Sequence, residues 1–344
     1  MSDLKIVRLL LCGMGNVHRN FLRILESQRA LLRDRYALDL VVVGATDSGG
    51  AAFDANGLDM QAVLMAKAQG RSVASLSGGV PGMDGCALLE AVPADLLLEA
   101  TTVSLRDGQP GLDTVRAALR RSMPVVLANK GPLALAFQEL ENIARTNGTQ
   151  MRYSACVGGA LPTINIGVRD LAGARVTKVE SMVNGTCQGI LRLMESGRGF
   201  ADALAEMQRR GVVEADPSLD IDGWDAAAKL VIIANAVLRR PTTMADVRIS
   251  GIRGLTLGDL RAADARGERY VLLGSAVPAG DDWVLTVEAT PLPHAHPLAR
   301  LSGDEMGVVY HTDISGSISA AVLETDAMPT AAAMLRDVVV MFSR

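Results

Sequence analysis

Short apolar runs alternate with helix-like stretches through the N-terminal part of the chain, and this alternation constrains the fold more than any other feature. The runs "KIVRLLL", "LDLVVVGA", "ADLLLEA" and "MPVVLA" are rich in Val and Leu, and each leads into a stretch with a helical pattern. Continuous apolar runs of this length are typical of strands buried on both faces of a parallel sheet. Strands that alternate with helices predict an α/β fold with a doubly wound parallel sheet, which we expect over residues 1–153.

The pattern changes after Tyr153. The helical stretches "CQGILRLMES" and "DGWDAAAKLVIIANAVL" precede two stretches, "GERYVLLGSAV" and "WVLTVEATPL", that read as antiparallel strands. A length of 344 residues suggests about two domains. We therefore expect a second, α+β domain with a mixed sheet over residues 154–317. The last helix, "PTAAAMLRDVVVMF", is expected to return to the first domain, so that residues 318–344 complete it.

Composition argues against several classes of protein. A net charge of -4 with no basic cluster argues against a nucleic-acid partner. No apolar run reaches the ~18 residues of a membrane span, and the N-terminus lacks the pattern of a signal peptide. We therefore expect a cytoplasmic protein. The four cysteines are scattered and read as small buried residues, and His294 and His296 read as loop residues, since no third zinc ligand is near.

A glycine-rich turn, "GMGNVH", follows the first strand and opens a helix, as in the dinucleotide-binding turn of Rossmann-type folds. Gly13 would form the tight turn, Gly15 would let the backbone approach a pyrophosphate, and the N–H groups from Asn16 and Val17 would bind its charge. His18 stands where a third glycine is expected. The alternative is an ordinary strand–turn–helix unit in which His18 is an exposed helix residue.

Further polar residues follow the other strands of this domain. Asp47 ends the second strand, Thr101 and Thr102 follow the third, and Lys130 follows the next. In such sheets ligands bind beyond the carboxyl ends of the strands, so these residues are candidates for a cofactor site. Asp47 would accept the ribose hydroxyls of NAD and repel the extra phosphate of NADP, which favours NAD slightly. The alternative for Asp47 is a turn residue after a strand.

The stretch "GVVEADPSLDIDGWDAAAK" gathers five acids in front of one lysine and a nearly pure apolar helix. Asp225 and Lys229 are four residues apart and share one helix face, with Asp222 as the expected N-cap. Carboxylates here suit a ligand with an ammonium group, and a lysine suits proton transfer at an alcohol. The alternative is that Asp225 and Lys229 form an exposed ion pair, which would contribute under ~1 kcal/mol to stability. An exposed pair fits less well at the start of a helix whose other residues are nearly all apolar.

Several motifs together resemble those of the homoserine dehydrogenases, in their short form without a C-terminal regulatory domain. They are "ANKGPLA", "CVGGALPTI", "NGTCQGIL", "HPLARL", "PTAAAML" and the acidic stretch with its apolar helix. They occur in the family's order and cover nearly the whole chain. The resemblance implies an NAD(P)-dependent oxidoreductase of amino-acid biosynthesis, on the route to threonine and methionine, that interconverts L-homoserine and L-aspartate 4-semialdehyde.

The same resemblance implies roles for individual residues. Lys229 matches the catalytic lysine and Lys130 a second active-site lysine beside the nicotinamide, while Glu214 and Asp225 match the carboxylates that hold the substrate's amino group. Asp220 lies near them. The remaining implied contacts are Asn184, Gly185 and Thr186 with the substrate and Gly211 with the cofactor. A homodimer is also implied, formed through the sheet of the second domain.

The resemblance further implies a monovalent cation such as Na⁺, bound by the backbone carbonyls of Val157, Gly159 and Leu161. The family has a glutamate near this site, where the chain has Ser154. Two more departures affect the cofactor side, because Glu324 and Asp326 stand where the family has glycines.

Three functions therefore remain open at this stage. The first is homoserine dehydrogenase with NAD or NADP. The second is a dehydrogenase of the same fold that acts on another amino alcohol. The third is a binding or regulatory relative that has lost its cofactor, although binding alone would not require both Lys130 and Lys229.

Overall fold

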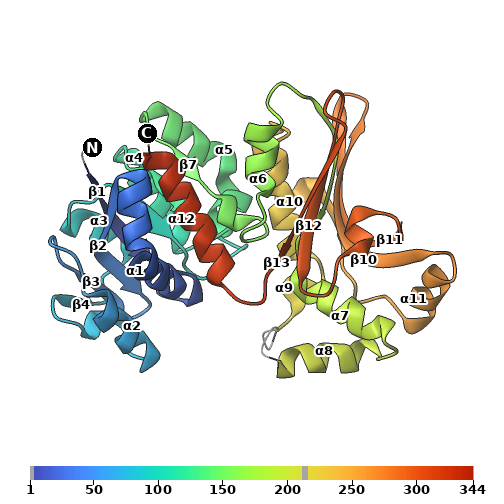
Figure 1. The fold of residues 1–344 in the computed structure, drawn as a ribbon, viewed down its shortest axis with the longest axis horizontal. Helices are drawn as coiled ribbons and strands as arrows, with labels where there is room; N and C mark the ends of the chain where they lie inside the picture. The colour runs from blue at the N-terminus through green and yellow to red at the C-terminus, as the bar shows by residue number, and fades with distance from the viewer. Residues whose placement is uncertain (1–3, 211–215, 344) are drawn as a thin grey trace. The chain divides into compact units, whose positions relative to one another are not determined.

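The computed structural model describes residues 4–210 and 216–343, which form two compact units (Figure 1). Unit 1 comprises Met1–Ala160 and Asp326–Arg344, and unit 2 comprises Leu161–Thr325. The sequence placed these divisions at residues 153 and 317, a few residues earlier in each case. Two of the predicted site residues, Gly211 and Glu214, lie outside the described residues.

Unit 1 is built on a seven-stranded sheet with the order β4-β3-β2-β1-β5-β6-β7. Its strands are β1 (Lys5–Cys12), β2 (Leu38–Asp47), β3 (Gly50–Phe53), β4 (Gly79–Pro81), β5 (Leu96–Glu99), β6 (Val125–Leu127) and β7 (Met151–Arg152). The four strands that the apolar runs predicted, β1, β2, β5 and β6, pair in parallel, and β7 pairs in parallel with β6. The sheet is thus mostly parallel, as expected, and its order reverses at β1.

The two strands at the β4 edge are antiparallel and were not predicted. Both are short and contain glycine, "GAAF" and "GVP", so their sequences read as loop. The helices of unit 1 are α1 (Asn16–Tyr36), α2 (Met60–Ala68), α3 (Gly85–Ala91), α4 (Gly111–Arg120), α5 (Gly131–Thr146) and α12 (Met328–Phe342). Asp84 caps α3, because its Oδ1 accepts the N–H of Ala87 at 2.8 Å.

The last helix belongs to unit 1, where α12 packs against α1 (Figure 1). Leu9 and Leu11 of β1, Phe21 of α1, and Met334 and Val338 of α12 are buried in one apolar core. This core sets β1 and the start of α1 firmly in place, and the turn between them is the one that the sequence predicts to bind a cofactor.

Unit 2 is built on a six-stranded mixed sheet with the order β13-β12-β8-β10-β11-β9. Its strands are β8 (Val176–Met182), β9 (Val247–Ser250), β10 (Glu268–Ala279), β11 (Asp282–Pro293), β12 (Glu305–Thr312) and β13 (Ser317–Leu323). Its helices are α6 (Thr163–Asn165), α7 (Gly185–Glu195), α8 (Phe200–Arg209), α9 (Ser218–Ile221), α10 (Trp224–Ala236) and α11 (Leu257–Asp264). The predicted antiparallel pair, β10 with β11, is present.

The helix α10 is buried on nearly all sides, as its apolar sequence requires. Its first residue follows Gly223, which has φ +90 and is the N-cap. The prediction that Asp222 caps this helix is therefore wrong. Asp222 instead forms an ion pair with Arg253 on the surface, with an N–O distance of 2.8 Å.

The four cysteines are free, and Cys12, Cys156 and Cys187 are buried. Across residues 4–210 and 216–343, no helix combines the length and the apolar character needed to span a bilayer.

Candidate active site

A pocket of about 490 Å³ lies at the carboxyl ends of the strands of unit 1. Five predicted cofactor residues line it: Gly13, Gly15, Asp47, Thr101 and Thr102. They come from the ends of β1, β2 and β5, which are neighbours in the sheet. Asn16, Val17 and Lys130 are not among the lining residues. This is the edge of the sheet at which doubly wound folds bind dinucleotides.

The turn after β1 needs glycine at Gly13. This residue has φ +88, and a Cβ atom there would lie 2.6 Å from the carbonyl oxygen of Ala100. At Gly15 a Cβ atom would meet open space. The helix α1 begins at Asn16, and its N-cap Gly15 has no side chain with which to cap it. The first N–H groups of α1 therefore suit an anion.

His18 is fully buried, so the alternative in which it is an exposed helix residue is wrong. Its Nδ1–H donates to the carbonyl oxygen of Gly13 at 2.6 Å, and its ring meets that of Phe21 edge-on. Burial lowers the pKa of His18 to about 4. The buried histidine thus stabilises the glycine turn through its hydrogen bond to Gly13.

The buried His18 predicts that the protein loses stability in mild acid. An exposed histidine has a pKa near 6.5, whereas His18 has a pKa of about 4, so the unfolded chain binds this proton more tightly. The contribution is complete above about pH 6.5 and declines as the pH falls toward 4. We expect the free energy of unfolding to fall by about 2 kcal/mol between about pH 7 and pH 5 through this group alone. Urea unfolding at both pH values should show this difference for the native chain and lose it in His18→Leu.

Asp47 is held by four hydrogen bonds that the sequence did not predict. Its Oδ1 accepts from the N–H of Gly49 (2.9 Å) and the hydroxyl of Ser72 (2.6 Å). Its Oδ2 accepts from Lys67 Nζ (2.6 Å) and the N–H of Val73 (3.0 Å). A carboxylate offers about four acceptor positions, and all four are used. Lys67 also lines the pocket.

Glu99 connects the two other cofactor segments beneath the pocket. It is fully buried at the end of β5, and burial raises its pKa. Its Oε1 accepts hydrogen bonds from the N–H (2.9 Å) and hydroxyl of Thr101 and from the side-chain amide of Asn129 (3.3 Å). Asn129 in turn accepts the N–H of Gly131 at 2.9 Å. The chain on both sides of Lys130 is thus tied to Thr101.

A second polar cluster forms in unit 2 where α7, α9 and α10 meet. The side-chain amide of Asn184 donates to Asp220 at 2.6 Å and to Asp225 at 2.8 Å. Lys229 Nζ donates to the same Asp225 Oδ2 at 2.7 Å and to the carbonyl oxygen of Val183 at 2.5 Å. These five residues come from three segments of the chain. The structure therefore brings together four of the residues predicted to handle the substrate.

The cluster has more negative than positive charge. Asp225 and Lys229 are both largely buried, with side-chain exposures of 12% and 14%, so theirs is not an exposed pair. Burial, and then the neighbouring charge of Asp225, raises the pKa of Asp220. Two carboxylates thus share one amide and one ammonium group. A ligand with an ammonium group would relieve the repulsion between them.

Gly185 and Thr186, the other predicted substrate residues that the structure describes, follow Asn184 at the start of α7. Asn184 is the N-cap of α7, and its Oδ1 accepts the N–H of Cys187 at 2.8 Å. Gly185 has open space where a Cβ atom would be, and Thr186 forms a side-chain hydrogen bond with Asp220. The sequence did not indicate Lys67, Glu99 or Asn129. Glu99 and Asn129 were detectable in principle, since each is polar at the end of an apolar strand.

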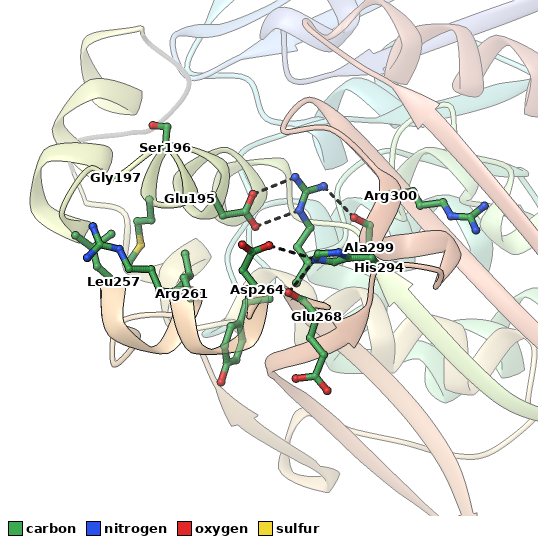
Figure 2. Close-up of a pocket in the computed structure, with 14 residues that line it drawn as sticks. Glu195, Ser196, Gly197, Leu257, Arg261, Asp264, Glu268, His294, Ala299 and Arg300 are labelled. Atoms are coloured by element: carbon green, nitrogen blue, oxygen red, sulfur yellow. Dashed lines mark hydrogen bonds and ion pairs between the residues drawn. The ribbon is translucent and has the colours of Figure 1, made fainter. Parts of the chain in front are cut away.

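Another cavity of unit 2, of about 680 Å³, has none of these cluster residues in its lining, which Figure 2 shows. Two pairs of its polar groups contact each other: Glu195 forms an ion pair with Arg269 (3.1 Å), and Asp264 faces His294 (3.6 Å). Arg269 also donates to the carbonyl oxygen of Ala299 at 2.9 Å. These contacts join the end of α7 to the loop after β11, so we interpret this cavity as structural.

The residues predicted for a monovalent cation lie where the chain passes from unit 1 to unit 2. The carbonyl oxygen of Leu161 accepts the N–H of Thr163 at 2.8 Å. The adjacent carbonyl of Ala160 accepts a hydrogen bond from the guanidinium of Arg336 at 3.2 Å. Two carbonyls of this segment thus already have donors.

Comparison with known proteins gives one consistent result. The family model for homoserine dehydrogenase matches residues 162–339. An NAD(+)-dependent homoserine dehydrogenase from Pseudomonas canavaninivorans is 33% identical, over 96% of this chain and 95% of its own. A homoserine dehydrogenase from Methanocaldococcus jannaschii is 32% identical, over 96% and 97%.

Solved structures agree with these relatives. A putative homoserine dehydrogenase from Archaeoglobus fulgidus superposes with a TM-score of 0.88 at 29% identity, over 98% of this chain and all of its own. A hyperthermophilic archaeal homoserine dehydrogenase mutant, solved in complex with NADPH, superposes with a TM-score of 0.83 at 25% identity, over 97% of both chains. The chain therefore belongs to the homoserine dehydrogenase family.

Proposed function

We propose that the chain catalyses the NAD(P)-dependent interconversion of L-homoserine and L-aspartate 4-semialdehyde, with Lys229 as the proton-transfer group. The observation that carries this proposal is the position of Lys229, which is held at 2.7 Å by Asp225 and at 2.5 Å by the Val183 carbonyl, beside Asp220 and Asn184. A lysine fixed among carboxylates fits an amino acid that carries a reactive oxygen.

The charge and the proton-transfer capacity of each side chain suggest its role in this reaction. Asp220, Asp225 and Glu214 bind the α-ammonium group and so fix the side chain of the substrate. During oxidation the neutral amine of Lys229 takes the proton from the hydroxyl and becomes the ammonium, and during reduction the ammonium returns this proton to the same oxygen. A bound NAD⁺ or NADP⁺ supplies the acceptor for the hydride that leaves the carbinol carbon. Lys130 would be the second lysine, beside the nicotinamide.

The reaction is tested by following reduced nicotinamide while the purified chain is given L-homoserine, 4-amino-1-butanol or L-serine. The proposal requires turnover with L-homoserine and much slower turnover with the other two. Faster turnover of another amino alcohol would favour the alternative dehydrogenase. Failure to bind either NADH or NADPH in a fluorescence titration would favour the binding relative.

The contacts of Asp47 remove the basis for preferring NAD. With four donors already bound, Asp47 has no acceptor position left for ribose hydroxyls. Its charge is also neutralised by Lys67, so it would repel a phosphate only weakly. Lys67 is instead placed to attract that phosphate. We therefore expect the chain to use both NAD and NADP.

Lys67→Gln is expected to weaken NADPH binding by about tenfold or more, since a lost charge-assisted contact costs roughly 1.5–3 kcal/mol. NADH, which lacks the phosphate, should be affected by less than about threefold. Fluorescence titration of both cofactors measures this, with Arg71→Gln as the control, because Arg71 is exposed nearby and contacts Gln69. Equal weakening of both cofactors would show that Lys67 only supports the fold.

We also propose a homodimer formed through the sheet of unit 2. Its strands carry exposed apolar side chains, with Val277 of β10 40% and Leu323 of β13 62% exposed. One chain has a mass of 36.2 kDa, so light scattering should give twice that mass, 72.4 kDa. A mass of one chain at micromolar concentration would rule out this proposal.

A further inference from the structure

The carboxyl group of Glu99 is buried behind Thr101, which lines the predicted cofactor pocket. Its Oε1 accepts hydrogen bonds from the N–H and the hydroxyl of Thr101 and from the side-chain amide of Asn129. Its Oε2 is shielded from solvent and has no hydrogen-bond partner among the described residues. The two oxygens of this one carboxyl group therefore have very different surroundings.

The groups that the structure places against Glu99 are uncharged. Its partners in the sheet are Cys12 of β1 and Leu127 of β6. Cys12 remains a neutral thiol, because burial raises the pKa of that thiol. Gly111, the first residue of α4, also lies against the carboxyl group, since a Cβ atom there would be 2.7 Å from Oε1. In the part of the chain that the structure describes, no charged side chain is among the groups that shift the pKa of Glu99.

Opposing influences act on the charge of Glu99. The three donors at Oε1 favour a carboxylate, and so does the first turn of α4 beside it. Burial opposes the charge, and it is the largest influence, so the pKa of Glu99 is raised. A proton on Oε2 would leave Oε1 to accept the three hydrogen bonds. A buried hydroxyl without a partner costs much less free energy than a buried charge without one.

We propose that Glu99 works as a neutral carboxylic acid, with its proton on Oε2, and that in this form it positions Thr101 and the segment 129–131 for the cofactor. Glu99 is a positioning residue, because it acts through Thr101 and through Asn129, whose Oδ1 accepts the N–H of Gly131 at 2.9 Å. The positioning role depends on the proposed function, whereas the charge state of Glu99 does not.

A neutral group suits this place because the cofactor is an anion. The pocket lining contains two aspartates, Asp47 and Asp84, and one lysine, Lys67. A further negative charge behind Thr101 would add to the repulsion of the phosphates of NAD or NADP, and burial would strengthen that repulsion.

The charge state is tested by urea unfolding of the native chain and of Glu99→Gln between about pH 5 and about pH 8. Glutamine has the shape of the neutral acid but does not ionise. A free glutamate has a pKa of 4.5 and Glu99 a higher one, so above that pH the unfolded native chain loses this proton more readily than the folded chain. The native chain should therefore lose stability relative to Glu99→Gln as the pH rises, by up to about tenfold in the folding equilibrium constant per pH unit, until Glu99 itself ionises.

His18 and the other titrating groups are present in both proteins, so their effects cancel in this comparison. A Glu99→Gln chain that loses stability relative to the native chain as the pH rises, or that does not fold at neutral pH, would overturn the neutral acid. Urea unfolding needs neither cofactor nor substrate, so its result stands whichever reaction the enzyme catalyses.

The positioning role is tested by titrating NADH into the native chain, Glu99→Gln and Glu99→Leu while following nicotinamide fluorescence. Glutamine still accepts the hydrogen bonds of Thr101 and Asn129, so its Kd should stay within about threefold of the native value. Leucine leaves those donors unpaired, so its Kd should rise about tenfold or more.

Asp337→Asn is the matched control for the titration. Asp337 is also buried, and its Oδ2 accepts the N–H of Ser154 at 2.9 Å, but Ser154 does not line the pocket. This variant should keep its Kd for NADH within about twofold. If Glu99→Leu does not fold, Asn129→Ala takes its place, because it breaks the connection between Glu99 and Gly131.

A native Kd for NADH in Glu99→Leu, or in Asn129→Ala where that variant replaces it, would overturn the positioning role. Failure of the native chain itself to bind NADH would contradict the proposed function and, with it, the positioning role. The urea comparison would still decide the charge state of Glu99.

Discussion

Lys229→Met is expected to lower kcat by about 10²–10⁴, the usual contribution of a general acid–base group, while the fold is kept. Methionine fills a similar volume but neither accepts nor donates the proton of the substrate oxygen. The substitution also removes the ion pair with Asp225 and the hydrogen bond to the Val183 carbonyl. Steady-state turnover at saturating homoserine measures the loss.

Two controls separate catalysis from folding. Circular dichroism and thermal unfolding of the variant should match those of the native chain to within a few degrees. Lys178→Met is the matched variant, because Lys178 also forms an ion pair with a buried carboxylate, Glu180, at 2.8 Å. Turnover of Lys229→Met within about threefold of the native value would remove this lysine from the mechanism.

Asp220→Asn is expected to raise the KM for L-homoserine by about tenfold or more, with a smaller effect on kcat. The substitution keeps the shape of the side chain but removes one of the carboxylate charges proposed to bind the ammonium group. A charge-assisted hydrogen bond is worth roughly 1.5–3 kcal/mol, which corresponds to this change in binding. The pair between Lys229 and Asp225 remains in place, so proton transfer should continue.

Asp222→Asn is the control for this prediction. Asp222 lies two residues away in the same acidic stretch, but it pairs with Arg253 at the surface. Its substitution should leave KM within about twofold. Equal changes for the two variants would indicate a general effect of charge and not a contact with the substrate.

The sequence predicted the parts of the fold that depend on local patterns. Buried strands read as apolar runs because both of their faces are covered, and α10 read as a buried helix because it is apolar all round. The acidic stretch indicated a functional site for a related reason. Asp225 and Lys229 lie near the start of a helix that must be buried, so their charges are largely buried as well.

Contacts between distant segments were not predictable in this way. Lys67 reaches Asp47 from a helix 20 positions later, and nothing near Asp47 in the sequence indicates it. Asp222 and Asp225 look alike in the sequence, yet one is at the surface and the other is buried. His18 broke a glycine pattern, and only the structure shows that its ring turns inward to Gly13.

The most direct test of the account compares two substrates, L-homoserine and 4-hydroxybutyrate, which is the same molecule without the amino group. If Asp220 and its neighbours bind the ammonium group while Lys229 acts on the oxygen, Asp220→Asn should lower kcat/KM by about tenfold or more with L-homoserine and leave it nearly unchanged with 4-hydroxybutyrate. Lys229→Met should impair both substrates alike. Equal losses with both substrates in Asp220→Asn would contradict the assignment of this acidic cluster to the amino group.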